Sequence, residues 1–263
     1  MYKLVALDID DTIINAKNNI SEKTKQAILK AQAKGVKVTL ASGRMYQSMK
    51  NLAGELEIKM PLISCNGAMI RSEEKLIECQ LLNKDIAKKA MEYFTGKNKV
   101  LQIYKPDGLY TKEKCERTWR LEQAEGLPCN IIDAKAYDGF YKEDILKLLI
   151  RLEPDEVDFF RSDIKKNFNG VLSYALSHRV YIEMTHLGIN KGKALSQLAQ
   201  MYGIKQSEVL AIGDSPNDKK MLEWAGLGIA MGNAMDEVKK VADITTSSIE
   251  DDGVAKALEE YVL

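Results

Sequence analysis

Short, mostly apolar runs alternate with segments of helical spacing near both ends of this chain, and this alternation limits the possible folds more than any other feature. The runs Lys3–Leu7 and Val36–Ala41 enclose a segment in which Ala27, Ile28 and Ala31 recur at helical spacing. Continuous apolar runs of this length are typical of strands buried on both faces of a parallel sheet. Strands that alternate with helices predict an α/β fold with a doubly wound parallel sheet.

The same rhythm continues at Leu62–Ser64, which we expect to be a third strand, and returns after residue 190. Ser21 is placed to cap the first helix, and Gly35 is placed to end it. Along the C-terminal part we expect two strands and four helices, in the order helix Lys191–Tyr202, strand Val209–Ile212, helix Asp218–Ala225, strand Leu227–Ala230, helix Val238–Val241 and helix Gly253–Tyr261.

The middle of the chain follows a different pattern. Pro106–Gly108 is a turn signal between the strand-like runs Val100–Tyr104 and Leu109–Thr111, so these two runs should pair antiparallel. We therefore predict an α+β domain at residues 84–185, inserted into a core domain formed by residues 1–83 and 186–263.

Charge and cysteine usage exclude several classes of function. Lysine plus arginine and aspartate plus glutamate both number 38, so no basic excess favours a nucleic-acid partner. No apolar stretch is long enough for a membrane span, and the N-terminus lacks the pattern of a signal peptide.

The four cysteines form no C-x-x-C pair, and neither histidine lies at zinc-ligand spacing from them. We expect ordinary thiols in a reducing cytoplasm rather than disulfides or a zinc site. The sequence carries no signal of oligomeric state.

Three polar motifs follow predicted strands directly. Asp8 and Asp10 come after the first strand, where side chains two positions apart share a face and like charges need a proton or a cation. Ser42 and Gly43 come after the second strand, where a hydroxyl and free N–H groups at a helix start can hold phosphate. Gly213–Asp218 follows the Val209–Ile212 strand.

Asp214 and Asp218 in this last motif supply oxygen ligands, which favour a hard cation such as Mg²⁺ over Zn²⁺. Lys191 opens a helix, where a cation is unfavourable unless anions lie nearby. Taken singly, each group has a plain structural explanation: an acidic turn, a capping serine, a capping loop or a surface lysine. Three of the groups stand at predicted carboxyl ends of strands, where ligands bind in open α/β sheets, and together with Lys191 they predict one ligand site.

With these residues in view, the chain resembles the haloacid dehalogenase superfamily, in particular its Cof-like phosphatases with a large α/β cap. The resemblance is carried by motifs from both predicted core segments, in order: Asp8–Thr12, Ala41–Arg44, Asn66–Ala68, Lys191–Leu195, Gly213–Asp218 with Met221–Leu222, Ala230–Ala234 and Glu250–Ala255. Residues 84–185 match the cap mainly in length and placement.

The resemblance implies an Mg²⁺-dependent phosphatase that forms an aspartyl-phosphate on Asp8. By the matching motifs, Asp10 would act as general acid and base, and Lys191 would neutralise charge on the nucleophile and phosphate. Ser42, Gly43 and Asn217 would bind the transferring phosphoryl group. Mg²⁺ would bind Asp8, the backbone carbonyl of Asp10 and Asp214, with Asp218 supporting these ligands.

One position departs from the family pattern, because Asp11 stands where many relatives have glycine. Aspartate tolerates left-handed backbone better than most residues, so the turn should survive. The substrate would be a small phosphate ester, with sugar phosphates, pyridoxal phosphate and flavin-pathway phosphates as open choices, and the cap would set the choice. Two alternatives differ in chemistry: a phosphosugar mutase or phosphotransferase of the same fold, and a phosphorylatable receiver-type signalling protein. The receiver order differs from this chain, because here the acceptor follows the first strand.

Overall fold

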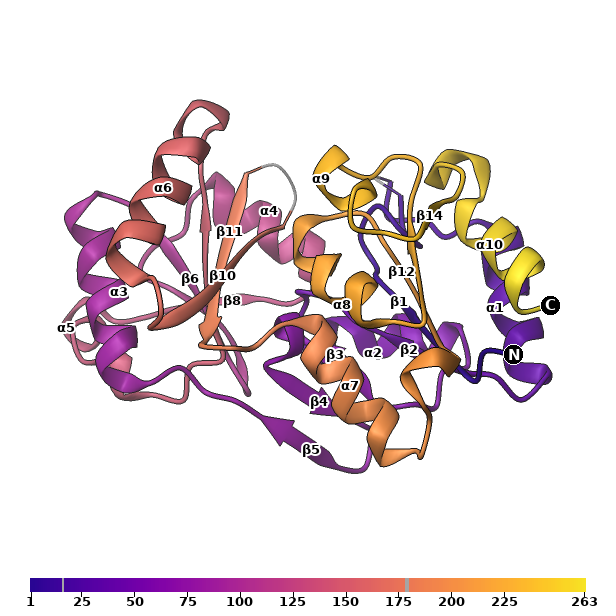
Figure 1. The fold of residues 1–263 in the computed structure, drawn as a ribbon. Helices are drawn as coiled ribbons and strands as arrows, with labels where there is room; N and C mark the ends of the chain where they lie inside the picture. Colours follow the sequence, from indigo (N-terminus) through magenta and orange to yellow (C-terminus); the bar gives the residue numbers. More distant parts are fainter. Residues whose placement is uncertain (16, 178–179) are drawn as a thin grey trace. The chain divides into compact units, whose positions relative to one another are not determined.

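The structure is a computed structural model that describes residues 1–15, 17–177 and 180–263. The chain divides into two compact units (Figure 1). Unit 1 consists of Met1–Ile77 and Asn190–Leu263, and unit 2 consists of Glu78–Ile189. The α+β insert expected at residues 84–185 lies within unit 2.

Unit 1 is built on a parallel sheet with strand order β14-β13-β12-β1-β2. Its strands are β1 (Leu4–Leu7), β2 (Lys37–Leu40), β12 (Val209–Gly213), β13 (Leu227–Ala230) and β14 (Ile244–Thr245). Every residue of β1 and β12 is buried, as expected for strands covered on both faces. The predicted α/β fold with a parallel sheet is therefore confirmed.

Helices cover both faces of this sheet, with α1 and α10 on one face and α7 and α8 on the other (Figure 1). The helices of unit 1 are α1 (Glu22–Ala33), α2 (Tyr46–Glu55), α7 (Lys191–Met201), α8 (Lys219–Trp224), α9 (Asp236–Lys239) and α10 (Gly253–Tyr261). The cap expected at Ser21 is present, since its hydroxyl accepts the N–H of Thr24 at 3.1 Å. Ala27, Ile28 and Ala31 form the buried stripe of α1.

The third predicted strand, β3 (Leu62–Ser64), lies outside the parallel sheet. It pairs antiparallel with β4 (Met69–Arg71) in a three-stranded sheet that ends at β5 (Leu76–Cys79), and a bridge between Ala41 and Ile63 links it to the end of β2. The short helix η1 (Cys65–Gly67) has left-handed backbone and reverses the chain directly after β3. The reversal lets β4 pair with β3, which the apolar pattern of β3 alone did not indicate.

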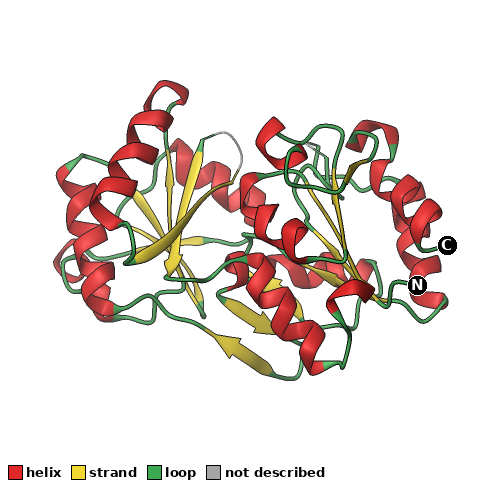
Figure 2. Cartoon of the chain, in the orientation of Figure 1, coloured by secondary structure: helices red, strands yellow, loops and turns green. Residues whose placement is uncertain are grey.

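Unit 2 contains a six-stranded sheet with strand order β10-β11-β9-β6-β7-β8, antiparallel except for the parallel β7–β8 pair. Its strands are β6 (Leu101–Lys105), β7 (Gly108–Thr111), β8 (Cys129–Ile131), β9 (Lys147–Arg151), β10 (Leu172–Ser177) and β11 (Tyr181–His186). Its helices are α3 (Lys84–Gly96), α4 (Glu116–Glu125), α5 (Ala134–Tyr137) and α6 (Val157–Phe168), drawn red in Figure 2. The predicted hairpin turn at Pro106–Gly108 is confirmed by the β6–β7 pairing.

The other short 3₁₀ helices are η2 (Phe140–Lys142), η3 (Pro154–Glu156), η4 (Gln206–Glu208), η5 (Pro216–Asp218) and η6 (Ile249–Asp251). None of the helices in the described ranges combines the length and apolarity that a membrane crossing needs.

Unit 2 holds a buried ion pair within its sheet. Lys147 of β9 binds Glu183 of β11, and both are almost fully buried. Ser177 donates a second hydrogen bond to Glu183, and the ammonium group lies 3.8 Å from the ring centroid of Tyr104. The Tyr104 hydroxyl in turn donates to the buried Glu125 of α4 at 3.0 Å. Removing one partner of such a pair leaves the other charge buried without compensation.

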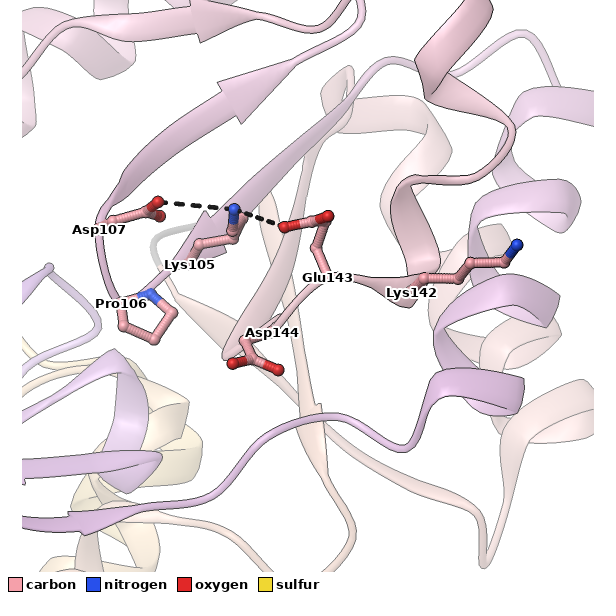
Figure 3. A pocket seen from close by; sticks show the side chains of 6 residues that line it. All are labelled: Lys105, Pro106, Asp107, Lys142, Glu143 and Asp144. Atoms are coloured by element: carbon pink, nitrogen blue, oxygen red, sulfur yellow. Dashed lines mark hydrogen bonds and ion pairs between the residues drawn. The ribbon is translucent and has the colours of Figure 1, made fainter.

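A cavity of about 400 Å³ lies between the β6–β7 turn and the segment before β9 (Figure 3). Lys105 stands in its wall, paired with Glu143 at 2.9 Å and with Asp107 at 3.5 Å. None of the site residues predicted from the sequence lines this cavity, which is completed by Pro106, Lys142 and Asp144.

We expect Lys147→Met to lower the free energy of unfolding by about 3–5 kcal/mol, because Glu183 would keep a buried charge with its cation removed. Urea unfolding followed by circular dichroism measures the change. The matched control is Lys135→Met, an exposed lysine of the same unit, which should change stability little. Equal effects of the two variants would show that the ion pair is dispensable.

Candidate active site

The carboxyl ends of β1 and β12 bring Asp8 and Asp214 together. In the parallel register Leu7 lies opposite Ile212, and the N–H of Asp8 donates to the carbonyl of Ile212 at 3.0 Å. Both aspartates are buried, at 4% and 6% exposure. The chain leaves β1 toward β2 on one side, whereas β12 continues toward β13 on the other. Ligands bind at such a reversal of strand order in open α/β sheets.

Lys191 occupies the first position of α7 and is completely buried. Its Nζ lies 2.5 Å from Oδ1 of Asp8 and 2.6 Å from Oδ1 of Asp218. These two carboxylates explain why a cation is stable at a helix N-terminus, where the helix dipole opposes it. The alternative of a solvated surface lysine is wrong.

Asp218 is held by three donors. Besides Lys191, the backbone N–H groups of Asp214 and Ser215 bind its Oδ2 at 3.0 and 2.9 Å. Gly213 makes this possible, because a Cβ there would lie 2.6 Å from the carboxyl carbon of Asp218. With both oxygens engaged, Asp218 fixes the turn that carries Asp214.

The predicted phosphate ligands lie on neighbouring turns of unit 1. Ser42 follows β2, is 1% exposed, and its hydroxyl accepts the N–H of Arg44 at 3.2 Å. Gly43 lies half-buried in the same turn. Asn217 in η5 is buried, and its Nδ2 donates to Oδ1 of Asn66 at 3.0 Å. These side chains come from the ends of β2, β3 and β12.

Asp10 lies farther toward solvent than Asp8. Arg44 binds it through Nε, at 3.0 Å to Oδ2, and through a terminal nitrogen, at 2.6 Å to Oδ1. The side chains of Arg44 and Asp10 are 13% and 31% exposed. This two-point contact fixes the plane of the Asp10 carboxylate.

The turn after β1 adopts the left-handed backbone conformation that its sequence allows. Asp11, in place of the usual glycine, has φ of 56°, so the expected left-handed turn is confirmed. Asn233 donates to the Asp11 carbonyl at 2.8 Å, and Thr12 donates to Oδ1 of Asp214 at 2.8 Å. The loop that carries Asp8 and Asp10 is thereby hydrogen-bonded to the C-terminal part of unit 1 at two places, Asp214 and Asn233.

Burial and mutual repulsion shift the proton affinity of the aspartates. Burial, followed by repulsion from Asp218, raises the pKa of Asp8 well above its ordinary value, although Lys191 opposes the shift. The same two causes raise the pKa of Asp214 to about 7, against hydrogen bonds from Thr12 and Ser215. Burial lowers the pKa of Lys191, but attraction to Asp218 and Asp8 outweighs it, so this pKa is raised. Lys191 is therefore a fixed positive charge.

The donor chemistry of this cluster suits a hard divalent cation. Oxygen atoms of Asp8, Asp214 and Asp218 lie within 4.8 Å of one another, and all three side chains are buried. One lysine does not neutralise three carboxylates, and a cation would offset the repulsion that raises the pKa values of Asp8 and Asp214. Because Asp218 is already engaged by three donors, Asp8 and Asp214 are the better candidates for direct ligands.

Four contacts were not anticipated from the sequence: Thr12 to Asp214, Ser215 to Asp214, Arg44 to Asp10 and Asn66 to Asn217. All of these residues stand inside the motifs singled out above. No spacing rule links residues 66 and 217, so only the folded arrangement reveals that pair.

Comparison with known proteins agrees with the architecture. The sequence model of haloacid dehalogenase-like hydrolases matches residues 5–258. The chain is 34% identical to the 5-amino-6-(5-phospho-D-ribitylamino)uracil phosphatase YcsE of Bacillus subtilis, over 99% of this chain and 96% of that protein. It is 31% identical to the putative phosphatase YxeH of the same organism, over 100% and 99% of the two chains.

Solved structures give the same result for the fold. A haloacid dehalogenase-like hydrolase from Bacteroides thetaiotaomicron superposes with a TM-score of 0.85 at 28% identity, covering 99% of both chains. Another from Bacillus subtilis superposes with a TM-score of 0.89 at 26% identity, covering 98% of this chain and 99% of that one. The family resemblance found in the sequence is confirmed, and the receiver-type alternative loses its support.

Without divalent cations, the site should make the protein less stable as the pH rises from about 4 through 7. The raised pKa of Asp214 means that the folded chain holds this proton more tightly than the unfolded chain. The resulting stability is full below the unfolded pKa and is lost as the pH passes the folded pKa. Asp214→Asn should therefore flatten the decline in unfolding free energy between about pH 4 and 7, measured by urea unfolding in EDTA.

The control for this experiment is Asp236→Asn, at an exposed aspartate of α9. It should follow the parent protein across the pH range. A decline in Asp214→Asn as steep as in the parent protein would contradict the assigned shift.

Proposed function

The chain belongs to the haloacid dehalogenase-like hydrolases and is a phosphoric monoester hydrolase, and we propose that it hydrolyses small phosphate esters through an aspartyl-phosphate on Asp8. One observation carries the proposal: Asp8, Lys191 and Asp214 converge at a single sheet edge although they lie far apart in the sequence. Phosphoryl transfer depends chiefly on positioning and charge stabilisation, and this edge offers both.

In the proposed reaction, a carboxylate oxygen of Asp8 attacks phosphorus as the bond to the leaving oxygen breaks. Lys191, which is bonded to Asp8, offsets negative charge on the nucleophile and on the phosphoryl oxygens. Ser42, Gly43 and Asn217 are positioned on adjacent turns to donate hydrogen bonds to those oxygens. Water then attacks the phosphorus of the aspartyl-phosphate and regenerates Asp8.

Asp10 is the proposed general acid and base. It would give its proton to the leaving alkoxide and then take one from the attacking water. Arg44 holds the Asp10 carboxylate in a fixed plane in this structure. A fixed plane limits the directions from which the leaving oxygen can approach, which favours one substrate orientation.

Mg²⁺ is the proposed cofactor. Asp8, Asp214 and the backbone carbonyl of Asp10 would hold it, while Asp218 keeps the 214–215 turn in place. When bound, the cation would supply charge stabilisation for the phosphoryl oxygens and orient them toward Asp8. The all-oxygen donor set supports this choice over Zn²⁺.

Among the substrate classes open from the sequence, we favour a flavin-pathway phosphate. Three Bacillus subtilis relatives, at 34%, 30% and 29% identity, are named 5-amino-6-(5-phospho-D-ribitylamino)uracil phosphatases. A more distant relative from Citrobacter koseri, at 25% identity, is named an HMP-PP phosphatase. We propose that the insert at residues 84–185 serves as the cap and sets specificity, and that the enzyme acts in the cytoplasm.

Aromatic residues of the insert differ in what they can contribute to specificity. Tyr104 is 1% exposed, with its hydroxyl bonded to Glu125, and belongs to the interior of unit 2. Trp119 is 57% exposed, so its ring remains available to stack on a substrate ring.

We expect Asp8→Asn to reduce kcat for p-nitrophenyl phosphate by about 10⁴-fold or more, since the amide cannot act as nucleophile. Released phosphate measures turnover, and circular dichroism checks the fold. Asp10→Asn should lose about 10²–10⁴-fold, because general acid help disappears while the nucleophile remains. EDTA should abolish parent activity, and Mg²⁺ should restore it.

The exposed substitution Asp236→Asn serves as the matched control and should leave kcat unchanged. Normal turnover by Asp8→Asn would overturn the nucleophile assignment. Full activity after metal removal would overturn the role of Asp214. Phosphate transferred to a sugar acceptor, with none released to water, would instead indicate the mutase alternative.

A panel of phosphorylated metabolites should rank 5-amino-6-(5-phospho-D-ribitylamino)uracil above hexose phosphates and pyridoxal phosphate in kcat/KM. A kcat/KM that is about tenfold higher for one substrate than for another corresponds to about 1.4 kcal/mol of differential transition-state binding. The measurement is phosphate release at substrate concentrations below KM. A higher kcat/KM for either of the other classes would replace the flavin-pathway assignment.

A further inference from the structure

The turn at Cys65–Gly67 lies among the site segments and has no role in the proposed chemistry. Three successive residues there have left-handed backbone: Cys65 at φ 50°, Asn66 at 58° and Gly67 at 93°. Two of them are not glycine. Such conformations are costly for residues with side chains and persist where the surroundings hold them in place.

The surroundings of this turn are the segments that carry the site residues. The N–H of Cys65 donates to the carbonyl of Arg44 at 2.9 Å, and the N–H of Asn66 donates to the carbonyl of Ser42 at 3.0 Å. Gly67 approaches the start of α7 so closely that a Cβ would lie 2.6 Å from the carbonyl oxygen of Asn190. The turn therefore contacts the 42–44 loop and the residue before Lys191.

The side chain of Asn66 reaches a further segment. Its Oδ1 accepts Nδ2 of Asn217 at 3.0 Å, and Asn66 itself is 5% exposed. Within the described part of the chain, Oδ1 of Asn217 is buried and has no hydrogen-bond partner. Since Oδ1 of Asn217 has no partner there, the hydrogen bond from Nδ2 to Asn66 determines which way the Asn217 amide faces.

We propose that Asn66 is a positioning residue that orients the Asn217 amide for phosphoryl binding. Because Oδ1 of Asn66 can only accept, the nitrogen of Asn217 must face it. One N–H of Nδ2 is then used by Asn66, and the second remains to donate to a phosphoryl oxygen. The reverse orientation would present a carbonyl oxygen to an anion, which is repulsive. This inference rests on the proposed function, since it requires that Asn217 bind the phosphoryl group.

Asn66→Gly is the main test, because glycine adopts the left-handed backbone without strain while the side chain that carries the acceptor is removed. We expect kcat/KM for p-nitrophenyl phosphate to fall by about 10–100-fold, with a comparable loss of orthovanadate inhibition. The thermal midpoint should stay close to that of the parent protein. The matched control is Asn98→Gly, at an exposed left-handed asparagine of unit 2 (φ 54°), which should leave activity unchanged.

A double-mutant cycle separates orientation from a merely structural effect. If Asn66 acts through Asn217, then Asn66→Gly combined with Asn217→Ala should be no more than about threefold worse than Asn217→Ala alone. Asn66→Asp provides a second variant, because aspartate keeps the acceptor and tolerates this backbone. It should retain kcat within about threefold and raise KM, since the added charge opposes a phosphate dianion.

The outcomes distinguish the two proposals. Additive losses in the double variant, or full activity of Asn66→Gly, would overturn the positioning role while leaving the phosphatase mechanism intact. Unchanged kcat/KM and vanadate inhibition in Asn217→Ala would instead overturn the phosphoryl-binding assignment itself. If Asn66→Gly does not fold, a kcat loss in Asn66→Asp as large as that of Asn217→Ala would count against the positioning role.

Discussion

The buried ion triad of Lys191 with Asp8 and Asp218 is the interaction on which the site depends. A lysine without solvent exposure is expensive to bury unless anions surround it closely, and here two carboxylates lie within 2.6 Å of its nitrogen. The triad joins the end of β1, the start of α7 and the helix that follows β12. These elements are fixed by sheet register and helix packing, so the charges are held on a rigid scaffold.

Close backbone approach makes this arrangement possible. Gly213 leaves room for the Asp218 carboxylate against the strand end, and Gly67 leaves room for the start of α7. Asp11 and Asn66 hold left-handed backbone where most residues would be strained. Backbone conformations and close approaches that most residues would not tolerate thus occur in the segments that carry the site, where the surrounding structure holds them in place.

Sequence reasoning predicted the parallel sheet and the order of its strands along the chain, because buried parallel strands are continuously apolar. It did not predict β4, β5, β8 or β14, which are short and lack a clear alternation. It also placed Leu62–Ser64 with the parallel strands, since a run of three residues does not reveal its partner. At the site, motifs at strand ends identified Asp8, Asp214 and Lys191. The contacts of Thr12, Arg44 and Asn66 were not predicted, because they depend on how side chains from segments distant in sequence are placed in the folded chain.

The pairing of β1 with β12 also has a consequence for how the chain is made. Leu4 pairs with Val209, so β1 leaves the ribosome roughly 10–40 s before its neighbour exists. During that interval unit 2, which is continuous in sequence, is completed, while one edge of β1 stays open. Its four buried residues then form an apolar strand with one unpaired edge, the kind of edge that associates with other chains. Translation speed and chaperone access in this interval therefore bear directly on the yield of active protein.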